Sequence, residues 1–281
     1  MATKAKPKAK PQGGEFCLFA VRLLDKFIEF IKGLLTADLL NFSIKWLTKI
    51  GHISIIVAAA LVFIFGIIAA IRAQAGGGSL FLNVVIFIIA IFVLQYTAHR
   101  FLPTGDKLIA NNPTRLASKA FLDCFGFLAM LAGLVIFFFY IYMAIKLPSL
   151  TYFLMGLGAF VFLEFLALIA FNAETVSMEI VKEASAGQEA IGIITFFMKA
   201  LLRLVPIAFG IGIAVYTVLV FIHSFGLFSD AKFRFAVVAA MFDGSQILIF
   251  TLLPFLAYIV FVLYFLIIDV IRSILAIPES K

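Results

Sequence analysis

The chain has 281 residues, of which 64% are hydrophobic and 13% are charged, and its mean hydropathy is +1.18. A soluble domain is roughly 45–50% apolar and about 25% charged, so this chain has more apolar surface than a globule of its size can bury. The composition excludes an ordinary soluble protein and indicates a lipid environment. The net charge of +7 could suggest a nucleic-acid partner, but the positions of the charges favour a different explanation.

The first 50 residues predict two segments outside the bilayer core. Residues 1–14 are rich in Lys, Ala, Pro and Gly, which is typical of a disordered basic tail. Residues 15–50 predict an amphipathic, interfacial helical segment, because charges recur every three or four positions on one face and large apolar residues on the other. Anionic lipids of the cytoplasmic face are the expected partners of these cations. The apolar face contains Phe16, Phe19, Leu23, Phe27, Phe30 and Leu34.

Residues 51–272 predict a transmembrane domain. Six segments in it are apolar over about the 20 residues that a helix needs to cross the hydrocarbon core. The triplet Gly76-Gly77-Gly78 and the single residue Pro148 mark short turns, so neighbouring spans pair as hairpins. The fold class is therefore an all-α integral membrane protein with six transmembrane helices in three hairpins, plus amphipathic interfacial helices. The predicted spans are 51–71, 80–97, 124–145, 149–171, 204–225 and 247–268.

The connections between the spans carry further predictions. A second surface helix is expected over 174–203, and residues 273–281 are expected to form a C-terminal tail. Turn-forming residues in 101–119 predict a loop there. The longest connection on the opposite side is 226–246. Within it, FRFAVVAAMF (233–242) is apolar but too short to cross, and it predicts a re-entrant or surface helix.

Lys and Arg are distributed unequally between the two sides of the predicted domain. With the N-terminus in the cytoplasm, 18 of the 22 Lys and Arg residues fall on the cytoplasmic side. Cytoplasmic loops carry such an excess, so both termini are predicted to be cytoplasmic and the basic charge is a topology signal. The compact loops favour a bacterial inner membrane, and no nucleic-acid partner is expected.

Two stretches place basic residues directly before an apolar run, FSIKWLTKIGHI (42–53) and FFMKALLRLVPI (196–207). The basic residues Lys45, Lys49, Lys199 and Arg203 are predicted to lie at the membrane interface. The likeness of the stretches has two interpretations. They are related by an internal duplication, or each simply meets the common requirement for cations at a membrane entry.

Glu164 is the main candidate for a functional side chain, because it is the only charge in GAFVFLEFLALIAF (158–171). A carboxylate inside a span is costly and is rare unless it faces protein or a cavity. Tyr264 is predicted to lie at a similar level and is a candidate partner. One hypothesis is a proton or cation site, and the other is a protonated structural residue or a contact with a partner subunit.

Small residues spaced for close helix packing recur in three of the predicted spans. They favour contacts within the chain or between copies. They are Gly156, Ala159, Ala167 and Ala170 in the fourth span, Ala129 and Gly133 in the third, and Ala208, Gly210, Gly212 and Ala214 in the fifth.

The sequence contains no enzyme, metal or cofactor motif. Hydrolase, zinc-protease, phosphate-loop and dinucleotide patterns are missing, and neither cysteine has metal or redox spacing. The first hypothesis is therefore a non-enzymatic anchor or scaffold subunit of a membrane complex, with protein partners or copies of itself. The alternative is a small proton- or cation-linked transporter or channel that uses Glu164.

Overall fold

The structure, a computed structural model, describes residues 15–73 and 76–275, and it is helical over nearly all of this part. Six of the helices are long and apolar enough to cross a membrane. The prediction of an all-α multipass membrane protein is confirmed. The helices are α1 Glu15–Leu34, α2 Ala37–Arg72, α3 Gly77–Asn111, α4 Lys119–Lys146, α5 Leu150–Phe171, α6 Ala186–Ser224 and α7 Phe233–Leu275, with 3-10 turns η1 Ala173–Val176 and η2 Phe225–Phe228.

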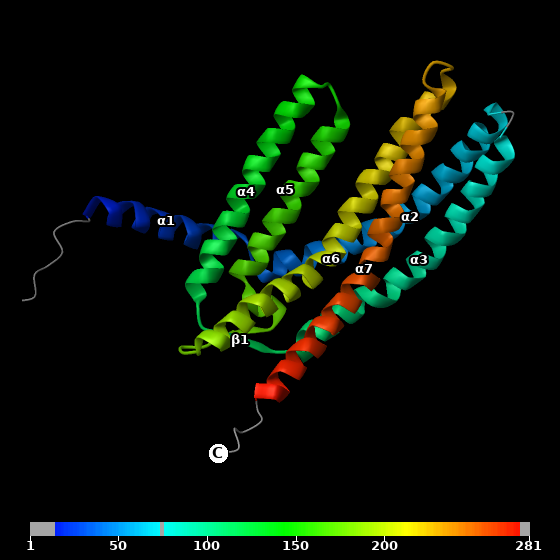
Figure 1. Ribbon diagram of the computed structural model, residues 1–281. Helices are drawn as coiled ribbons and strands as arrows, with labels where there is room; N and C mark the ends of the chain where they lie inside the picture. The colour runs from blue at the N-terminus through cyan, green and yellow to red at the C-terminus, as the bar shows by residue number, and fades with distance from the viewer. Residues whose placement is uncertain (1–14, 74–75, 276–281) are drawn as a thin grey trace, which may run out of the picture.

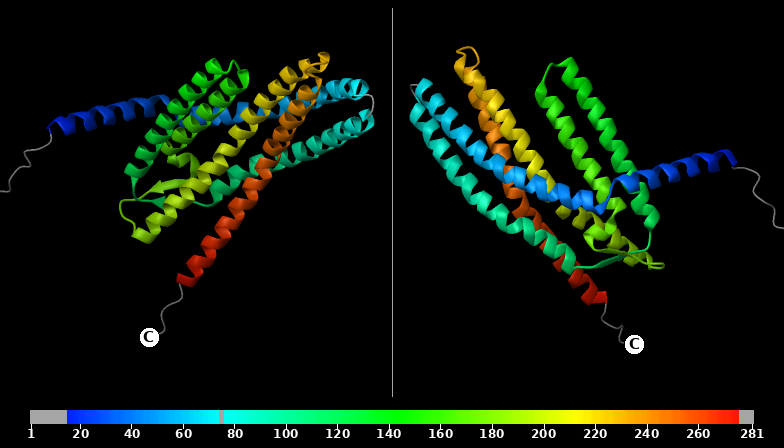
Figure 2. Two further views of the ribbon diagram at one scale, coloured as in Figure 1. Left: turned by 45° about the horizontal axis from the view of Figure 1, so that its top comes forward. Right: turned by 180° about the vertical axis from the view of Figure 1, so that it is seen from behind.

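The six long helices form three antiparallel hairpins (Figure 1). We call the end with α1 and the end of α7 the base, and the end with the connections 73–76, 147–149 and 225–232 the far end. Helices α2, α3, α6 and α7 pack together as one group, whereas the α4–α5 hairpin packs mainly on itself and contacts the group through α5 and, at the base, through aromatic rings of α4. Helix α1 extends sideways from the base, which is visible from three directions (Figures 1 and 2).

The base ends of α2, α3 and α6 extend well beyond the predicted spans. Helix α2 has 36 residues and α3 has 35, and a helix of that length is about 54 Å long, against about 30 Å of hydrocarbon. The expected loop at 101–119 is largely helical, with Pro103 inside α3. Hydropathy locates the part of a helix that lies in lipid, whereas the helix itself continues until a cap or a turn ends it.

The segment 15–50 contains two helices, because the chain breaks between α1 and α2. Thr36 is the N-cap of α2, and its Oγ1 accepts a hydrogen bond from the Leu39 N–H at 3.3 Å. In α1, Leu23, Phe27, Phe30 and Leu34 are exposed, whereas Ile31 is buried against the bundle. Residues 1–14, predicted to be a tail, lie outside the described residues. In the predicted tail 273–281, residues 273–275 complete α7 and the rest lie outside the description.

Two predicted surface elements belong instead to spanning helices. The second surface helix, expected at 174–203, is replaced by η1, a short strand and the first part of α6, which continues through Pro206 to Ser224. The stretch 233–242 is the beginning of the 43-residue helix α7. The sequence DGSQ (243–246) contains residues that are common in loops. Asp243 nevertheless lies inside α7, where its polar side chain is paired with His223 of α6.

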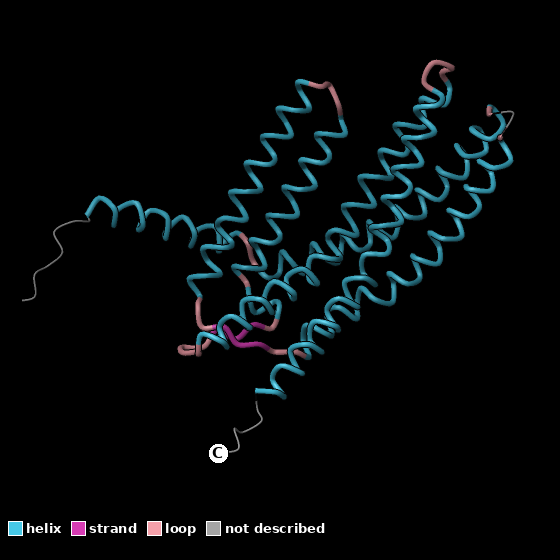
Figure 3. The backbone as a smooth tube through the Cα atoms, viewed as in Figure 1, coloured by secondary structure: helices cyan, strands magenta, loops and turns pink. Residues whose placement is uncertain are grey.

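A two-stranded parallel sheet lies at the base and was not predicted (Figure 3). Strand β1, Thr114–Leu116, pairs with β2, Met178–Ile180, in the register Thr114–Met178, Arg115–Glu179 and Leu116–Ile180. The sheet joins the α3–α4 connection to the α5–α6 connection. It ties the base of the α4–α5 hairpin to the rest of the molecule.

Candidate functional site

Glu189, near the start of α6, fixes the connection between β1 and α4. Its two carboxylate oxygens accept hydrogen bonds from the backbone N–H groups of Ala117 at 2.7 Å and Ser118 at 2.9 Å. Strand β1 also passes very close to α6, since a Cβ on Gly192 would lie 2.6 Å from the Arg115 carbonyl oxygen. The carboxylate and the glycine therefore hold the base of the α4–α5 hairpin on α6.

We expect Glu189→Ala to destabilise this connection. Hydrogen bonds that involve a charged group contribute about 1.5–3 kcal/mol each when they are formed, and two N–H groups would lose their acceptor. Thermal unfolding in detergent should show that the free energy of unfolding falls by about 2 kcal/mol. Glu183→Ala is the matched control, because Glu183 is exposed and has no partner among the described residues. Equal stability of the two variants would contradict this role of Glu189.

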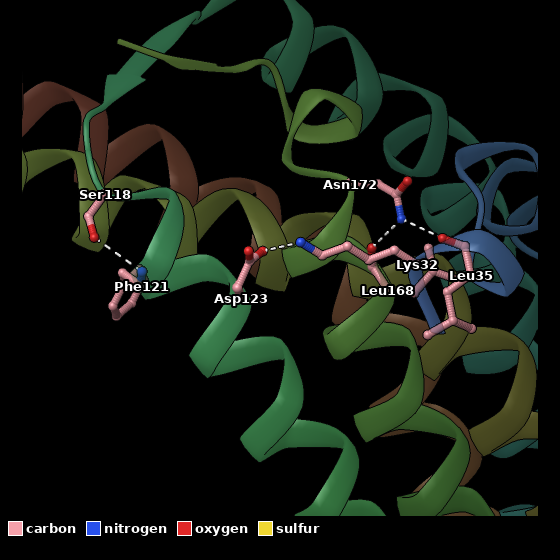
Figure 4. A network of polar contacts seen from close by, with 7 residues as sticks. All are labelled: Lys32, Leu35, Ser118, Phe121, Asp123, Leu168 and Asn172. Atoms are coloured by element: carbon pink, nitrogen blue, oxygen red, sulfur yellow. Dashed lines mark hydrogen bonds and ion pairs between the residues drawn. The ribbon is translucent and has the colours of Figure 1, made fainter. Parts of the chain in front are cut away.

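Polar contacts also hold α1 and the α1–α2 break on the α4–α5 hairpin (Figure 4). Lys32 Nζ lies 2.5 Å from Asp123 Oδ1 at the start of α4. The Asn172 side-chain amide donates to the carbonyl oxygens of Leu35 and Leu168, both at 2.8 Å. Helix α1 is thus attached at its C-terminal end, and the remainder extends away from the bundle with apolar side chains exposed.

The four basic residues predicted at the membrane interface lie in two different environments. Lys45 and Lys49 are exposed on α2. Lys199 is fully buried and donates to the Ser177 carbonyl oxygen at 3.1 Å. The Arg203 side chain is 12% exposed, and its guanidinium binds Asp106 and Asn41, each at 2.5 Å. Lys199 therefore attaches α6 to the turn after η1, and Arg203 joins α6 to α2 and α3, so these two residues do not form a cationic surface.

The side chain of Glu164 packs against α4, beside Gly133. A Cβ on Gly133 would lie 3.1 Å from Glu164 Oε1, so the missing side chain of the glycine leaves room for the carboxyl group. Glu164 Oε1 is buried and has no hydrogen-bond partner among the described residues. The residue is about seven positions from the base end of α5, or roughly 10 Å.

The structure does not bring Tyr264 to Glu164. The Tyr264 hydroxyl shares a hydrogen bond of 2.7 Å with Thr195 Oγ1, which joins α7 to α6 near the base. Arg203 and Lys199, which could also have reached the carboxyl group, have the partners described above. Glu164 therefore has no basic or hydroxyl partner among the described residues.

The predicted small residues lie at several different helix contacts. A Cβ on Gly156 would meet Tyr140 of α4, one on Gly210 would meet the Leu47 backbone of α2, and one on Gly212 would meet Phe250 of α7. Ala167 packs with Ala129 in a buried cluster that includes Ile31 of α1, and Ala170 belongs to the largest core cluster. Ala214 is half-buried, whereas Ala159 and Ala208 face a groove.

This groove lies between the α4–α5 hairpin and helices α6 and α7, and its volume is about 390 Å³. Small residues lie on both walls, Gly158 and Ala159 on α5 and Ala208 on α6, whereas Phe250 of α7 covers Gly212. The rest of the lining is almost entirely apolar. It consists of Tyr140, Leu154, Met155, Phe162, Ile211, Val215, Tyr216 and Phe250.

A buried hydrogen-bonded pair between α6 and α7 was not predicted from the sequence. His223 Nδ1 at the end of α6 lies 2.6 Å from Asp243 Oδ2 of α7, and the Asp243 side chain is only 4% exposed. Asp243 falls within the predicted connection 226–246, so it was not expected to lie in a helix opposite His223. A signal was nevertheless present, since an apolar run on each side of Asp243 is consistent with one long helix.

No protein-family model matches the chain, and comparisons with curated proteins and with solved structures return no match.

Proposed function

We propose that this protein is a non-enzymatic anchor or scaffold subunit of a membrane complex. The groove between α5 and α6 would hold a transmembrane helix of another polypeptide, either a partner or a second copy of this chain. The observation that carries the proposal is the pair of small-residue walls, which lets a helix backbone approach both sides closely. Helices in lipid associate through such close packing and not through a hydrophobic driving force.

The attachment of the α4–α5 hairpin supports this function. At the base, aromatic rings of α4 and α6 interlock, with ring centroids of Phe125 and Phe197 4.9 Å apart and those of Phe121 and Phe196 6.5 Å apart. Farther from the base, the hairpin and α6 diverge in both Figure 1 and Figure 2. A hairpin that is fixed at the base and diverges from α6 toward the far end is suited to receive another helix.

The arrangement of polar groups favours the scaffold over the transporter. Glu164 lies between α4 and α5 toward the base, whereas the His223–Asp243 pair lies between α6 and α7 toward the far end. Neither of the two cavities identified in the described chain is lined by Glu164. A transport path needs polar groups that follow one another along a cavity, and these groups do not.

Photo-cross-linking from the groove tests the proposal. A photoreactive phenylalanine analogue replaces Met155, which lines the groove, and in the control it replaces Phe138, which is 65% exposed on α4. In native membranes we expect a discrete protein adduct from position 155 and none from position 138. Lipid adducts alone from both positions would contradict a helix in the groove.

The transporter remains the second candidate, because a buried carboxyl oxygen without a partner is the usual feature of an intramembrane ion site. Glu164→Gln separates the two functions, since the amide has nearly the same shape but cannot titrate. The scaffold account expects unchanged complex mass and, in liposomes, proton and cation flux equal to that of the unmodified protein. A Glu164-dependent flux that is lost in Glu164→Gln would overturn the scaffold and establish the transporter.

We also propose the orientation that the charge distribution predicts, with the base in the cytoplasm of a bacterial cell. The base would then contact anionic lipid through α1 and the exposed Lys45 and Lys49. A cysteine introduced at Ser149, in the far-end connection, should react with a membrane-impermeant thiol reagent in intact cells. A cysteine at Lys45 should react only after lysis.

A further inference from the structure

A second cavity lies at the far end, where α2, α3, α6 and α7 meet, and its volume is about 190 Å³. Its inner wall is closed, since Val220 is 1% exposed, Leu227 2% and Ala69 7%. Ala69 of α2 and Ala240 of α7 are small residues of the lining, whereas Val84 and Phe87 of α3 occupy the room beside Gly66 and Gly244. Among the described residues, no Lys, Arg, Asp or Glu lines it. An apolar cavity of about this size stays dry and binds apolar groups.

The cavity opens sideways between α3 and α7. On its rim, Met241 is 54% exposed, and Asn83 and Ser245 are also exposed. The ribbons of α3 and α7 cross near the base and separate toward the far end (Figures 1 and 2). Because both helices cross the membrane, this opening faces the lipid and not water.

The rim carries a polar group that none of the described residues satisfies. Asn83 makes no hydrogen bond with any described residue, whereas the hydroxyl of Ser245 already donates to the Phe242 carbonyl oxygen at 2.7 Å. Asn83 is six residues into α3, or roughly 9 Å from its start, near the level where headgroups give way to hydrocarbon. An unpaired amide at this depth gains by binding an acceptor, and the ester carbonyl of a membrane lipid is the acceptor found there.

We propose that this cavity binds one acyl chain of a glycerophospholipid from the far-side leaflet, while the Asn83 amide donates to the ester carbonyl of that chain. The cavity has about half the volume of the groove beside α5. The bound chain fills the space between the α2–α3 and α6–α7 hairpins at the end where their helices separate. This inference does not depend on the scaffold function.

The test uses the full-length protein in phosphatidylcholine vesicles that contain a phosphatidylcholine with a diazirine in the middle of one acyl chain. Mass spectrometry then locates the labelled residues. We expect labelling concentrated on the cavity lining of α3 and α7. Ala240→Phe, which fills the cavity, should lower this labelling at least tenfold. Ala60→Phe, at an exposed position of α2, should leave it unchanged.

Asn83→Leu provides a second, independent variant, because Asn83 lies on the rim and its replacement does not fill the interior. We expect this variant to keep its thermal stability and to lose labelling at least threefold. Labelling of the lining that is equal in the unmodified protein, Asn83→Leu and Ala240→Phe would overturn the proposal. Labels spread evenly over the lipid-facing surface would overturn it as well, since they would indicate ordinary surrounding lipid. If Ala240→Phe fails to fold, Asn83→Leu alone decides between these outcomes.

Discussion

Gly210→Ala is expected to separate α2 from α6 and to produce one of the largest losses of stability of any single substitution. A Cβ at this position would lie 2.3 Å from the Leu47 carbonyl oxygen and 2.6 Å from its carbonyl carbon. These atoms belong to the backbone of α2, so the overlap can be relieved only if the two helices move apart. Overpacking usually costs about 1–3 kcal/mol, and we expect about 3 kcal/mol here because the neighbour is rigid.

Gly158→Ala is the matched control for this prediction. Gly158 also lies inside a spanning helix, but the nearest atom to an added Cβ is a side-chain carbon of Ile211 at 3.7 Å, which is ordinary contact. Alanine is favoured over glycine in helices by up to about 1 kcal/mol, so this variant should be neutral or slightly more stable. Denaturation in mixed detergent micelles compares the two variants. Equal stability of Gly210→Ala and Gly158→Ala would contradict the close α2–α6 contact.

His223→Ala is expected to destabilise the α6–α7 hairpin, because it leaves the buried Asp243 without its partner. Removal of one member of a buried pair costs about 3–5 kcal/mol, and we expect the lower value because the His223 side chain is 23% exposed. Reversible unfolding in detergent, followed by far-UV circular dichroism, measures this loss.

The double variant His223→Leu with Asp243→Leu separates the pairing from simple loss of packing. Apolar residues that replace both members of a buried pair are often neutral or stabilising, so the double variant should recover most of the lost stability. If the free energy of unfolding of His223→Ala is within about 0.5 kcal/mol of that of the unmodified protein, the pair does not contribute to stability in the way proposed.

The part of the fold that hydropathy controls was predictable from the sequence. Apolar runs long enough for a bilayer, separated by Gly-Gly-Gly and by Pro148, give the number and the pairing of the spanning helices. Helix ends were not predictable in the same way. Thr36 lies in the break after α1 and caps α2, whereas α3 and α6 continue through Pro103 and Pro206. Only the surroundings of each residue decide whether a helix ends there.

The candidate sites show the same limit. Glu164 was identified because it is a charge in an apolar run, but its neighbour Gly133 and its lack of a partner depend on the α4–α5 contact. Asp243 was missed because its partner, His223, is twenty residues away in the chain. The groove and the far-end cavity arise from the angles between helices. Helix angles depend on the sum of many packing contacts, which periodicity in one helix does not encode.

The mass and composition of the native particle, extracted in a mild detergent, test the central claim most directly. Native mass spectrometry resolves a 30.9 kDa chain from its complexes. A scaffold subunit with a helix in the groove predicts a stoichiometric protein partner or a homo-oligomer, and the assembly should weaken when Gly158 and Ala208 are both replaced by Leu. A monomer that carries only lipid and detergent would contradict the account, and the flux measurement on Glu164→Gln would then take precedence.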